Sequence, residues 1–89
     1  MSAYEILDRK HVIATILFIY RNPGCMKTEL YEATSRNAQM PKRLDELESM
    51  GLLTQSRSGL SGTTILKLTS KGVRIAECLE QMNSIMDVP

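Results

Sequence analysis

KTELYEATSRNAQMPKRLDELESMGLLTQ, residues 27–55, contains two helical patterns separated by a turn. Either Lys27 or Thr28 opens the first helix, which is predicted over residues 29–34. A turn is predicted at residues 35–37, because Ser and Asn side chains compete for backbone hydrogen bonds. A second helix then leads to a glycine, so this stretch predicts two helices joined by a short turn.

The second helix has a single apolar stripe at positions i, i+4, i+7 and i+10, made of Met40, Leu44, Leu47 and Met50. Pro41 lacks an amide hydrogen and fits only a first turn, so the regular helix is predicted to begin around residues 38–40. Gly51 is placed to end it in the left-handed conformation that other residues resist.

Further elements are predicted on both sides of this stretch. A helix over residues 2–20 begins with a Ser2–Glu5 capping box, stops at Asn-Pro-Gly and has two apolar stripes, and residues 25–26 form a bridge of strand. Strands over residues 52–57 and 63–68 enclose a Gly- and Ser-rich turn, which describes a hairpin. Thr69 caps a last helix over residues 70–86. These elements fit one domain covering residues 1–89.

Composition limits the functional classes. The chain has 89 residues, 24% of them charged and 43% hydrophobic, with 11 Lys and Arg against 10 Asp and Glu and a net charge of +1. That balance disfavours indiscriminate coating of nucleic acid or membranes. The longest strongly apolar stretch, residues 12–20, is about half of the ~20 residues that a membrane span needs. No signal peptide is visible, so the expected location is the cytosol.

Catalytic and metal-binding motifs are not evident. Cys25 and Cys78 lie 53 positions apart, and a redox switch or a shared metal site is less expected for them than two reduced, buried thiols. His11 is the one histidine, and no phosphate loop, HExxH or GxSxG motif occurs. Catalysis, a cofactor and a metal are therefore not expected, which leaves a binding role.

The order helix, short helix, turn, helix, hairpin, helix resembles winged-helix transcription regulators. Residues 27–55 resemble their helix-turn-helix core, LDELESMGLLTQ at residues 44–55 resembles the end of their recognition helix, and LTSKG at residues 68–72 is similar to the Leu-Thr-x-x-Gly that opens their last helix. The likeness covers residues 8–82 and is nearest to small archaeal regulators, with the MarR, PadR and ArsR groups more distant. It implies an α+β, mostly helical winged helix-turn-helix with a three-helix core, a two-stranded β-wing and a C-terminal helix.

The residues on the expected DNA face have suitable chemistry. With the apolar stripe inward, Lys42 points outward, flanked by basic and amide side chains that can read base edges. Lys27 and Thr28 can touch phosphate, and Arg57 is the one base of the wing before its tip. An ordinary solvated helix face would have a similar pattern. The predicted DNA contacts are Lys27, Thr28, Arg36, Asn37, Gln39, Lys42, Arg43 and Arg57.

The last helix has an apolar seam at 3-4-3 spacing, which predicts a homodimer formed by the first and last helices of two chains. The seam consists of Ile75, Cys78, Met82 and Ile85, and Leu79 and Met86 widen it on one side. A tail helix lying on the first helix of its own chain would also explain the pattern.

The sequence therefore predicts a dimeric transcription regulator that binds double-stranded DNA without chemistry of its own. An effector signal, if any, would come from a separate protein partner, since no polar cluster marks a pocket. The rival hypothesis is a winged-helix module that binds another protein through the last helix and does not bind DNA.

Overall fold

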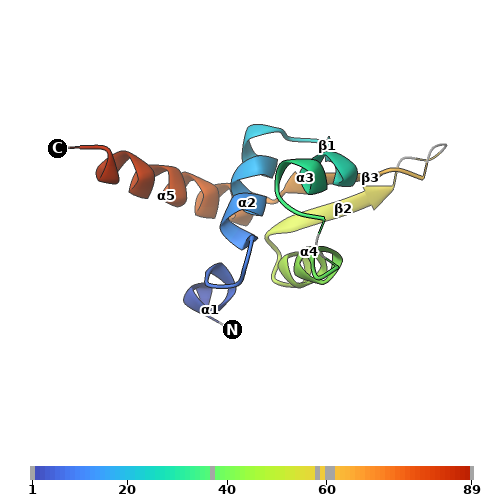
Figure 1. Cartoon of the computed structure of the whole chain (residues 1–89), viewed down its shortest axis with the longest axis horizontal. Helices are drawn as coiled ribbons and strands as arrows, with labels where there is room; N and C mark the ends of the chain where they lie inside the picture. The colour runs from blue at the N-terminus through green and yellow to red at the C-terminus, as the bar shows by residue number, and fades with distance from the viewer. Residues whose placement is uncertain (1, 37, 58, 60–61, 89) are drawn as a thin grey trace.

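The computed structural model describes residues 2–36, 38–57, 59 and 62–88. Its elements, in chain order, are α1 (Ala3–Leu7), α2 (Val12–Arg21), β1 (Cys25–Met26), α3 (Lys27–Ala33), α4 (Met40–Ser49), β2 (Leu53–Arg57), β3 (Thr64–Leu68) and α5 (Ser70–Met86) (Figure 1). The mostly helical α+β class is confirmed, and α5 has the predicted bounds. Asn37, one of the predicted DNA contacts, lies outside the described residues.

The sheet is antiparallel with strand order β1-β3-β2. In the hairpin, Leu53 pairs with Leu68 and Arg57 with Thr64, whereas Cys25 pairs with Leu66 on the other side of β3. Leu66 is buried, so its face of the central strand meets the core. The two-residue β1 thus joins the predicted two-stranded wing to the helical core.

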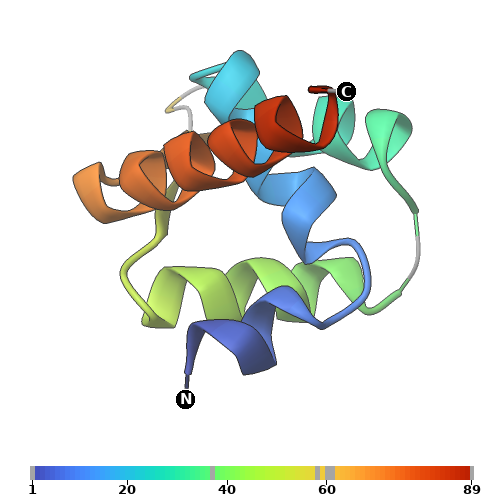
Figure 2. The ribbon, with the colours of Figure 1, turned by 90° about the vertical axis from the view of Figure 1, so that its left-hand side faces the viewer.

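The single helix predicted over residues 2–20 is wrong, because the chain breaks between α1 and α2. His11 adopts a left-handed conformation with φ 67°, and its carbonyl accepts the Thr15 hydroxyl at 2.6 Å. In an unbroken helix, Ile6 and Val12 would point about 120° apart, since each residue turns the helix by 100°. The break lets both side chains reach one core, where each is at most 1% exposed. It also lays α1 alongside α4 (Figure 2).

A tight connection joins α4, β2 and α5. Gly51 ends α4 with φ 76°, as predicted, and Thr69 caps α5 by accepting the Gly72 amide at 3.1 Å. The Thr69 amide donates to the Leu52 carbonyl at 3.0 Å. A Cβ at Gly72 would lie 2.0 Å from that carbonyl oxygen, so this close approach requires glycine.

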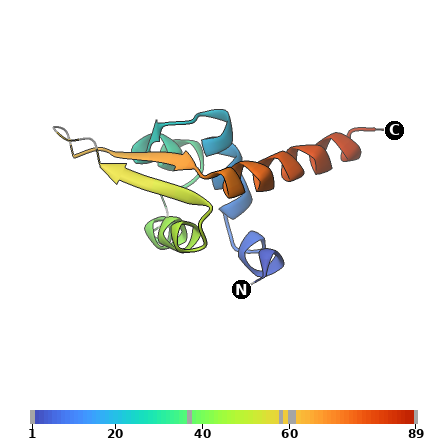
Figure 3. The same ribbon diagram turned by 180° about the vertical axis from the view of Figure 1, so that it is seen from behind.

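The first half of α5 packs on α2, and its second half projects from the body. Arg21 of α2 forms a bond from each of two guanidinium nitrogens to Glu80, at 2.6 and 3.0 Å. Residues 81–88 are all exposed. The molecule extends 49 Å along its longest axis against 25 Å across, with α5 at one end and the hairpin at the other (Figure 3). The first half of α5 therefore lies on its own chain, as the alternative arrangement predicted, and the homodimer stays a prediction.

Candidate nucleic-acid interface

The outward face of α4 is centred on Lys42. Met40, Leu44 and Leu47 are at most 1% exposed and fix the inner side of the helix. Lys42 lies two residues after Met40, about 200° around the helix, and is exposed. Within the part of the chain that the structure describes, its ammonium group has no ion-pair partner. The predicted orientation of the helix is therefore the observed one.

The acidic residues on one flank of α4 are bonded to the wing. The Gln55 side-chain amide of β2 donates to Asp45 at 3.0 Å and to Glu48 at 3.3 Å. Its backbone amide also donates to Glu48, at 2.9 Å. These bonds hold both carboxylates toward β2, beside the face that presents Lys42.

On the opposite flank, Glu46 is shared between two arginines. Arg9, in the turn after α1, lies 3.0 Å from one carboxylate oxygen, and Arg43 lies 2.7 Å from the other. The side chain of Arg43 is only 19% exposed. The prediction that Arg43 stands outward beside Lys42 is thus wrong, because Glu46 draws its guanidinium toward α1. Its contact with DNA stays a prediction.

The residues just before α4 remain accessible. Arg36 is exposed and makes one 3.2 Å contact with Glu32, in a pair whose side chains are 75% and 65% exposed. Such an exposed pair contributes little stability and leaves the guanidinium available to another anion. Gln39 is exposed and occupies the N-cap position of α4.

The start of α3 already holds a carboxylate. The Glu29 side chain accepts the Met26 amide at 2.9 Å, and Met26 is the N-cap residue. Lys27 opens the helix and is half-buried, while Thr28 is exposed at the second helical position and is not the cap. The negative charge of Glu29 weakens the attraction of this helix end for phosphate. The predicted phosphate contacts of Lys27 and Thr28 stay untested.

In the wing, Arg57 is exposed at the last position of β2. Lys67 of β3 is also exposed, but it lines a hollow between α2 and α5 with Tyr20 and Pro23. Arg57 therefore extends the cationic surface toward the hairpin tip, whereas Lys67 belongs to a different part of the molecule.

Three residues of the α1–α2 turn escaped the sequence prediction. Arg9 pairs with α4, and Lys10 and His11 line a small cleft with Gln39, Met40 and Arg43. Sequence spacing alone could not relate residues 9–11 to residues 39–46, because the predicted unbroken helix has no turn at that point. A non-glycine residue in the left-handed conformation is not marked by a strong sequence pattern, so His11 did not indicate the break in the helix.

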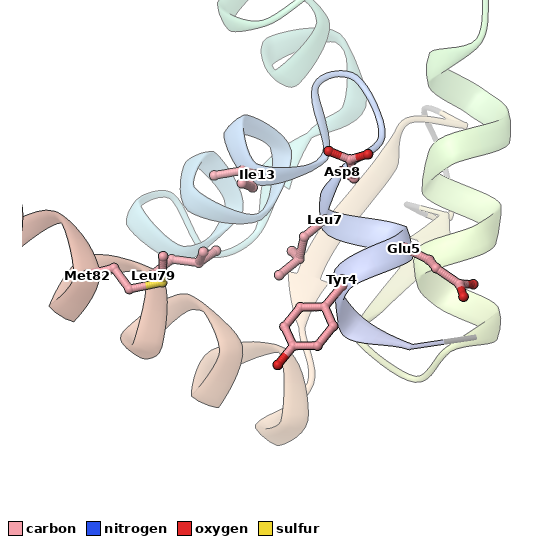
Figure 4. A pocket seen from close by; sticks show the side chains of 7 residues that line it. All are labelled: Tyr4, Glu5, Leu7, Asp8, Ile13, Leu79 and Met82. Carbon is pink, nitrogen blue, oxygen red and sulfur yellow. The ribbon is translucent and has the colours of Figure 1, made fainter.

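A separate apolar groove lies between α1, α2 and α5. Tyr4 and Leu7 of α1 face Leu79 and Met82 of α5, with Ile13 of α2 between them (Figure 4). A continuation of the groove is lined by Leu17, Asn83 and Met86, among others. This surface brings together the two helical regions that were predicted to form the dimer.

The predicted seam of α5 is only partly open. Leu79 is 8% exposed and Ile75 is half-buried, so both already pack on their own chain. Met82, Ile85 and Met86 are 62%, 66% and 82% exposed. Cys78 is exposed, which contradicts its expected burial, whereas Cys25 is buried as expected. Burial, and secondarily the carboxylate of Glu29, raises the pKa of the Cys25 thiol.

Tyr31 of α3 has a buried hydroxyl with no hydrogen-bond partner in the described chain. Burial and the nearby charge of Asp45 raise its pKa. No group of three or more His, Cys, Asp or Glu side chains among the described residues could hold a metal ion. None of the helices in that part combines the length and the apolar character needed to cross a bilayer.

Solved structures share this architecture. FabT of Streptococcus pneumoniae, crystallised in complex with DNA, is 23% identical with a TM-score of 0.76, and the match covers 97% of this chain and 57% of FabT. MepR, a transcription regulator of the Staphylococcus aureus multidrug efflux pump MepA, is 18% identical with a TM-score of 0.79, covering 94% of this chain and 64% of MepR. AF1382 from Archaeoglobus fulgidus is 16% identical with a TM-score of 0.80, covering 99% and 100%.

The chain has the winged-helix fold. The similarity extends to bacterial and archaeal proteins alike, so it supports the winged-helix resemblance but not a nearest relation to the archaeal proteins. This chain spans less than two thirds of the length of FabT or MepR. No family model and no curated protein matches the sequence.

Proposed function

We propose that this protein is a transcription regulator that binds double-stranded DNA with α4 in the major groove and acts as a homodimer. The observation that carries the proposal is the charge arrangement of α4. All three acidic residues of the helix are bonded within the chain on its flanks, and Lys42 stands exposed between them. The same fold in FabT, crystallised with DNA, supports this use of the surface.

The accessible side chains suit sequence recognition. Lys42 and Arg36 can donate to guanine, and Gln39 can pair with adenine in the major groove. Gln39 is the N-cap residue of α4 and Lys42 lies in its N-terminal half, the part that enters the groove in helix-turn-helix proteins. If about four bases per subunit neutralise phosphates, a dimer has a slope of log affinity against log salt near −7.

Binding to random-sequence duplexes, followed by enrichment and sequencing of the bound fraction, tests the DNA assignment. The enriched duplex is then titrated by fluorescence anisotropy at two salt concentrations. Lys42→Ala is expected to weaken binding about 10-fold, a loss of roughly 1–3 kcal/mol for one base contact. Lys67→Ala is the matched control, because that exposed lysine lies between α2 and α5. Absence of duplex binding at low salt, or equal losses in both variants, would contradict the proposal.

The dimer would use the apolar groove and the open half of α5. Met82, Ile85 and Met86 form a short apolar strip on a projecting helix, and Tyr4 and Ile13 continue it across the groove. A symmetric pair buries this strip against its copy and supplies two DNA half-sites. A single domain with the few available cations would bind DNA weakly.

Sedimentation at several concentrations tests the dimer with two variants that add the same charge to neighbouring positions. Met82→Glu puts a carboxylate in the apolar strip and is expected to give a monomer. Gln81→Glu lies beside it on an exposed residue outside the strip and is expected to remain dimeric. A wild-type monomer, or a Met82→Glu dimer, rejects this interface.

The rival protein-binding module is not favoured, because the structures with the same fold include regulators such as MepR. A protein partner that supplies effector sensing and a cytosolic location both stay predictions.

A further inference from the structure

A small cleft separates the α1–α2 turn from the start of α4. Its lining consists of Lys10, His11, Gln39, Met40 and Arg43. Its volume is about 120 Å³, and roughly 10–15 Å³ on the same measure holds one water molecule, so a tetrahedral oxyanion fits. The cleft is thus defined by two segments that lie almost 30 positions apart in the chain.

The chemistry of this cleft is that of an anion site. Lys10 and Arg43 contribute two cations, His11 contributes an imidazole, and the lining contains no carboxylate. The carboxylate paired with this lining is Glu46, which binds Nη1 of Arg43 and is also neutralised by Arg9. Arg9, Lys10 and Arg43 carry three positive charges and Glu46 carries one negative charge, so this group has a net charge of +2. Arg43 has five N–H donors, so its bond to Glu46 leaves others for an incoming oxyanion.

Two helix starts meet at the same cleft. His11 is the N-cap residue of α2 and Gln39 that of α4, and neither helix has an acidic residue in its first turn. The positive ends of both helices therefore add to the field of the basic side chains. The left-handed backbone of His11 lies in the α1–α2 turn. This turn passes beside the start of α4 (Figure 2).

The position of the cleft relative to Lys42 indicates the source of the anion. Gln39 and Arg43 lie about 60–100° around α4 from Lys42, on the flank opposite β2. A helix with its side chains is about 10–12 Å wide and the major groove about 12 Å, so a phosphate ridge runs close to each flank of an inserted helix. Arg57 of the wing lies on the side of α4 that faces β2, and the cleft lies on the opposite side of α4.

We propose that the cleft between the α1–α2 turn and α4 binds a backbone phosphate of the DNA, with Lys10, His11 and Arg43 as its ligands. This site rests on the proposed DNA binding and deepens it. It clamps the duplex on the side away from the wing, which fixes the depth and tilt of α4 in the groove. It also compensates for the few bases of the wing.

Duplex binding by Lys10→Gln across a salt series tests the site. Lys10 is exposed and has no ion pair among the described residues, so the variant is expected to fold normally. Loss of one phosphate contact reduces the magnitude of the salt slope by about 1 per subunit. Between 50 and 200 mM salt, the variant would then lose about 3.5-fold less affinity than wild type for each contact removed. Lys67→Gln, on the surface between α2 and α5, is expected to keep the wild-type slope.

His11→Gly provides a second test. Glycine adopts the observed φ of 67° without steric cost, so the turn is kept while the imidazole is lost. Binding is expected to weaken about 10-fold or more, as for one hydrogen bond to a charged group. Wild-type slope in Lys10→Gln together with wild-type affinity in His11→Gly overturns the site while leaving the DNA-binding proposal intact.

Inorganic phosphate distinguishes a backbone phosphate from a free one. Phosphate is titrated into the protein while the amide resonances of Lys10 and His11 are followed by NMR. If these resonances shift only at millimolar phosphate, in a protein that binds duplex through the cleft, the result supports a phosphate of the DNA backbone as the ligand. Tight phosphate binding without any binding of duplex overturns both the DNA source and the proposed function, and identifies the cleft as a site for a free oxyanion.

Discussion

Gly72 tests the connection that fixes α5 to the rest of the fold. Alanine at this position places a Cβ 2.0 Å from the Leu52 carbonyl oxygen, 3.0 Å from the Leu52 carbonyl carbon and 3.2 Å from the Leu68 Cβ. The two closest atoms belong to backbone, so no flexible side chain can move aside. Either α5 or the segment before β2 must shift by about 1 Å to restore contact distances near 3 Å.

The cost follows from what this shift disturbs. Leu52 and Leu53 are 4% and 1% exposed, and overpacking such a region costs roughly 1–3 kcal/mol. The bond from the Thr69 amide to Leu52 is worth about 1 kcal/mol more. Alanine restricts the unfolded chain and returns about 0.4–1 kcal/mol. The expected net loss is about 1–3.5 kcal/mol, and a loss of about 2 kcal/mol lowers the melting temperature by roughly 8–16 °C for a domain of this size.

Thermal and urea unfolding followed by circular dichroism, at one protein concentration, measures this loss. Two glycine controls separate its causes. Gly59→Ala meets no atom within 4 Å and is expected to change stability by less than about 0.5 kcal/mol. Gly51→Ala also meets open space, but its φ of 76° predicts a cost near 1 kcal/mol. A Gly72→Ala protein as stable as Gly59→Ala would refute the close-approach explanation.

Two further predictions concern the titratable groups that the candidate interface does not use. Tyr31→Phe removes a buried hydroxyl that has no partner in the described chain, so stability at neutral pH is expected to stay equal or rise by up to about 1 kcal/mol. Because folding raises the pKa of Tyr31, ionisation of its hydroxyl opposes folding as pH rises above the unfolded value of about 10. Wild type is therefore expected to lose stability more steeply than Tyr31→Phe above that pH in urea melts. Iodoacetamide is expected to modify exposed Cys78 rapidly and Cys25 only on unfolding, because Cys25 is buried and its pKa is raised. If α5 forms the dimer, labelling of Cys78 should slow as protein concentration rises, and equal labelling of the two thiols in the native protein would contradict the buried position of Cys25.

Elements with local sequence patterns were predictable. The bounds of α5, the Thr69 cap, the left-handed Gly51 and the inward stripe of α4 each depend on residues within a few positions of one another. In these cases helix periodicity and capping chemistry act over one or two turns, and tertiary packing agrees with them. The orientation of Lys42 follows from the same local pattern.

Features that depend on distant contacts were not predictable in this way. The helix predicted over residues 2–20 had continuous apolar stripes, yet burying both Ile6 and Val12 in one core required a break at His11. The partly buried position of Arg43 depends on its ion pair with Glu46, and Arg9 of the α1–α2 turn contacts the same carboxylate. Leu79 also fits an interhelical seam by spacing, but it is already buried within its own chain. The spacing of apolar residues along one helix identifies its apolar face. The tertiary fold determines which element packs against that face.

The arrangement around α4 explains how a chain with a net charge of only +1 can present an anion-binding surface. At physiological salt, charges farther apart than about 8 Å are largely screened, so the local distribution matters more than the total. The wing holds Asp45 and Glu48 on one flank, and the α1–α2 turn neutralises Glu46 on the other. If α4 enters the major groove as proposed, each flank removes acidic charge from the side that faces the groove and also places a cation, Arg57 or Lys10, toward the neighbouring phosphate ridge. The wing and the α1–α2 turn would therefore act as a pair, and loss of either should weaken the docking of α4 without altering its own residues.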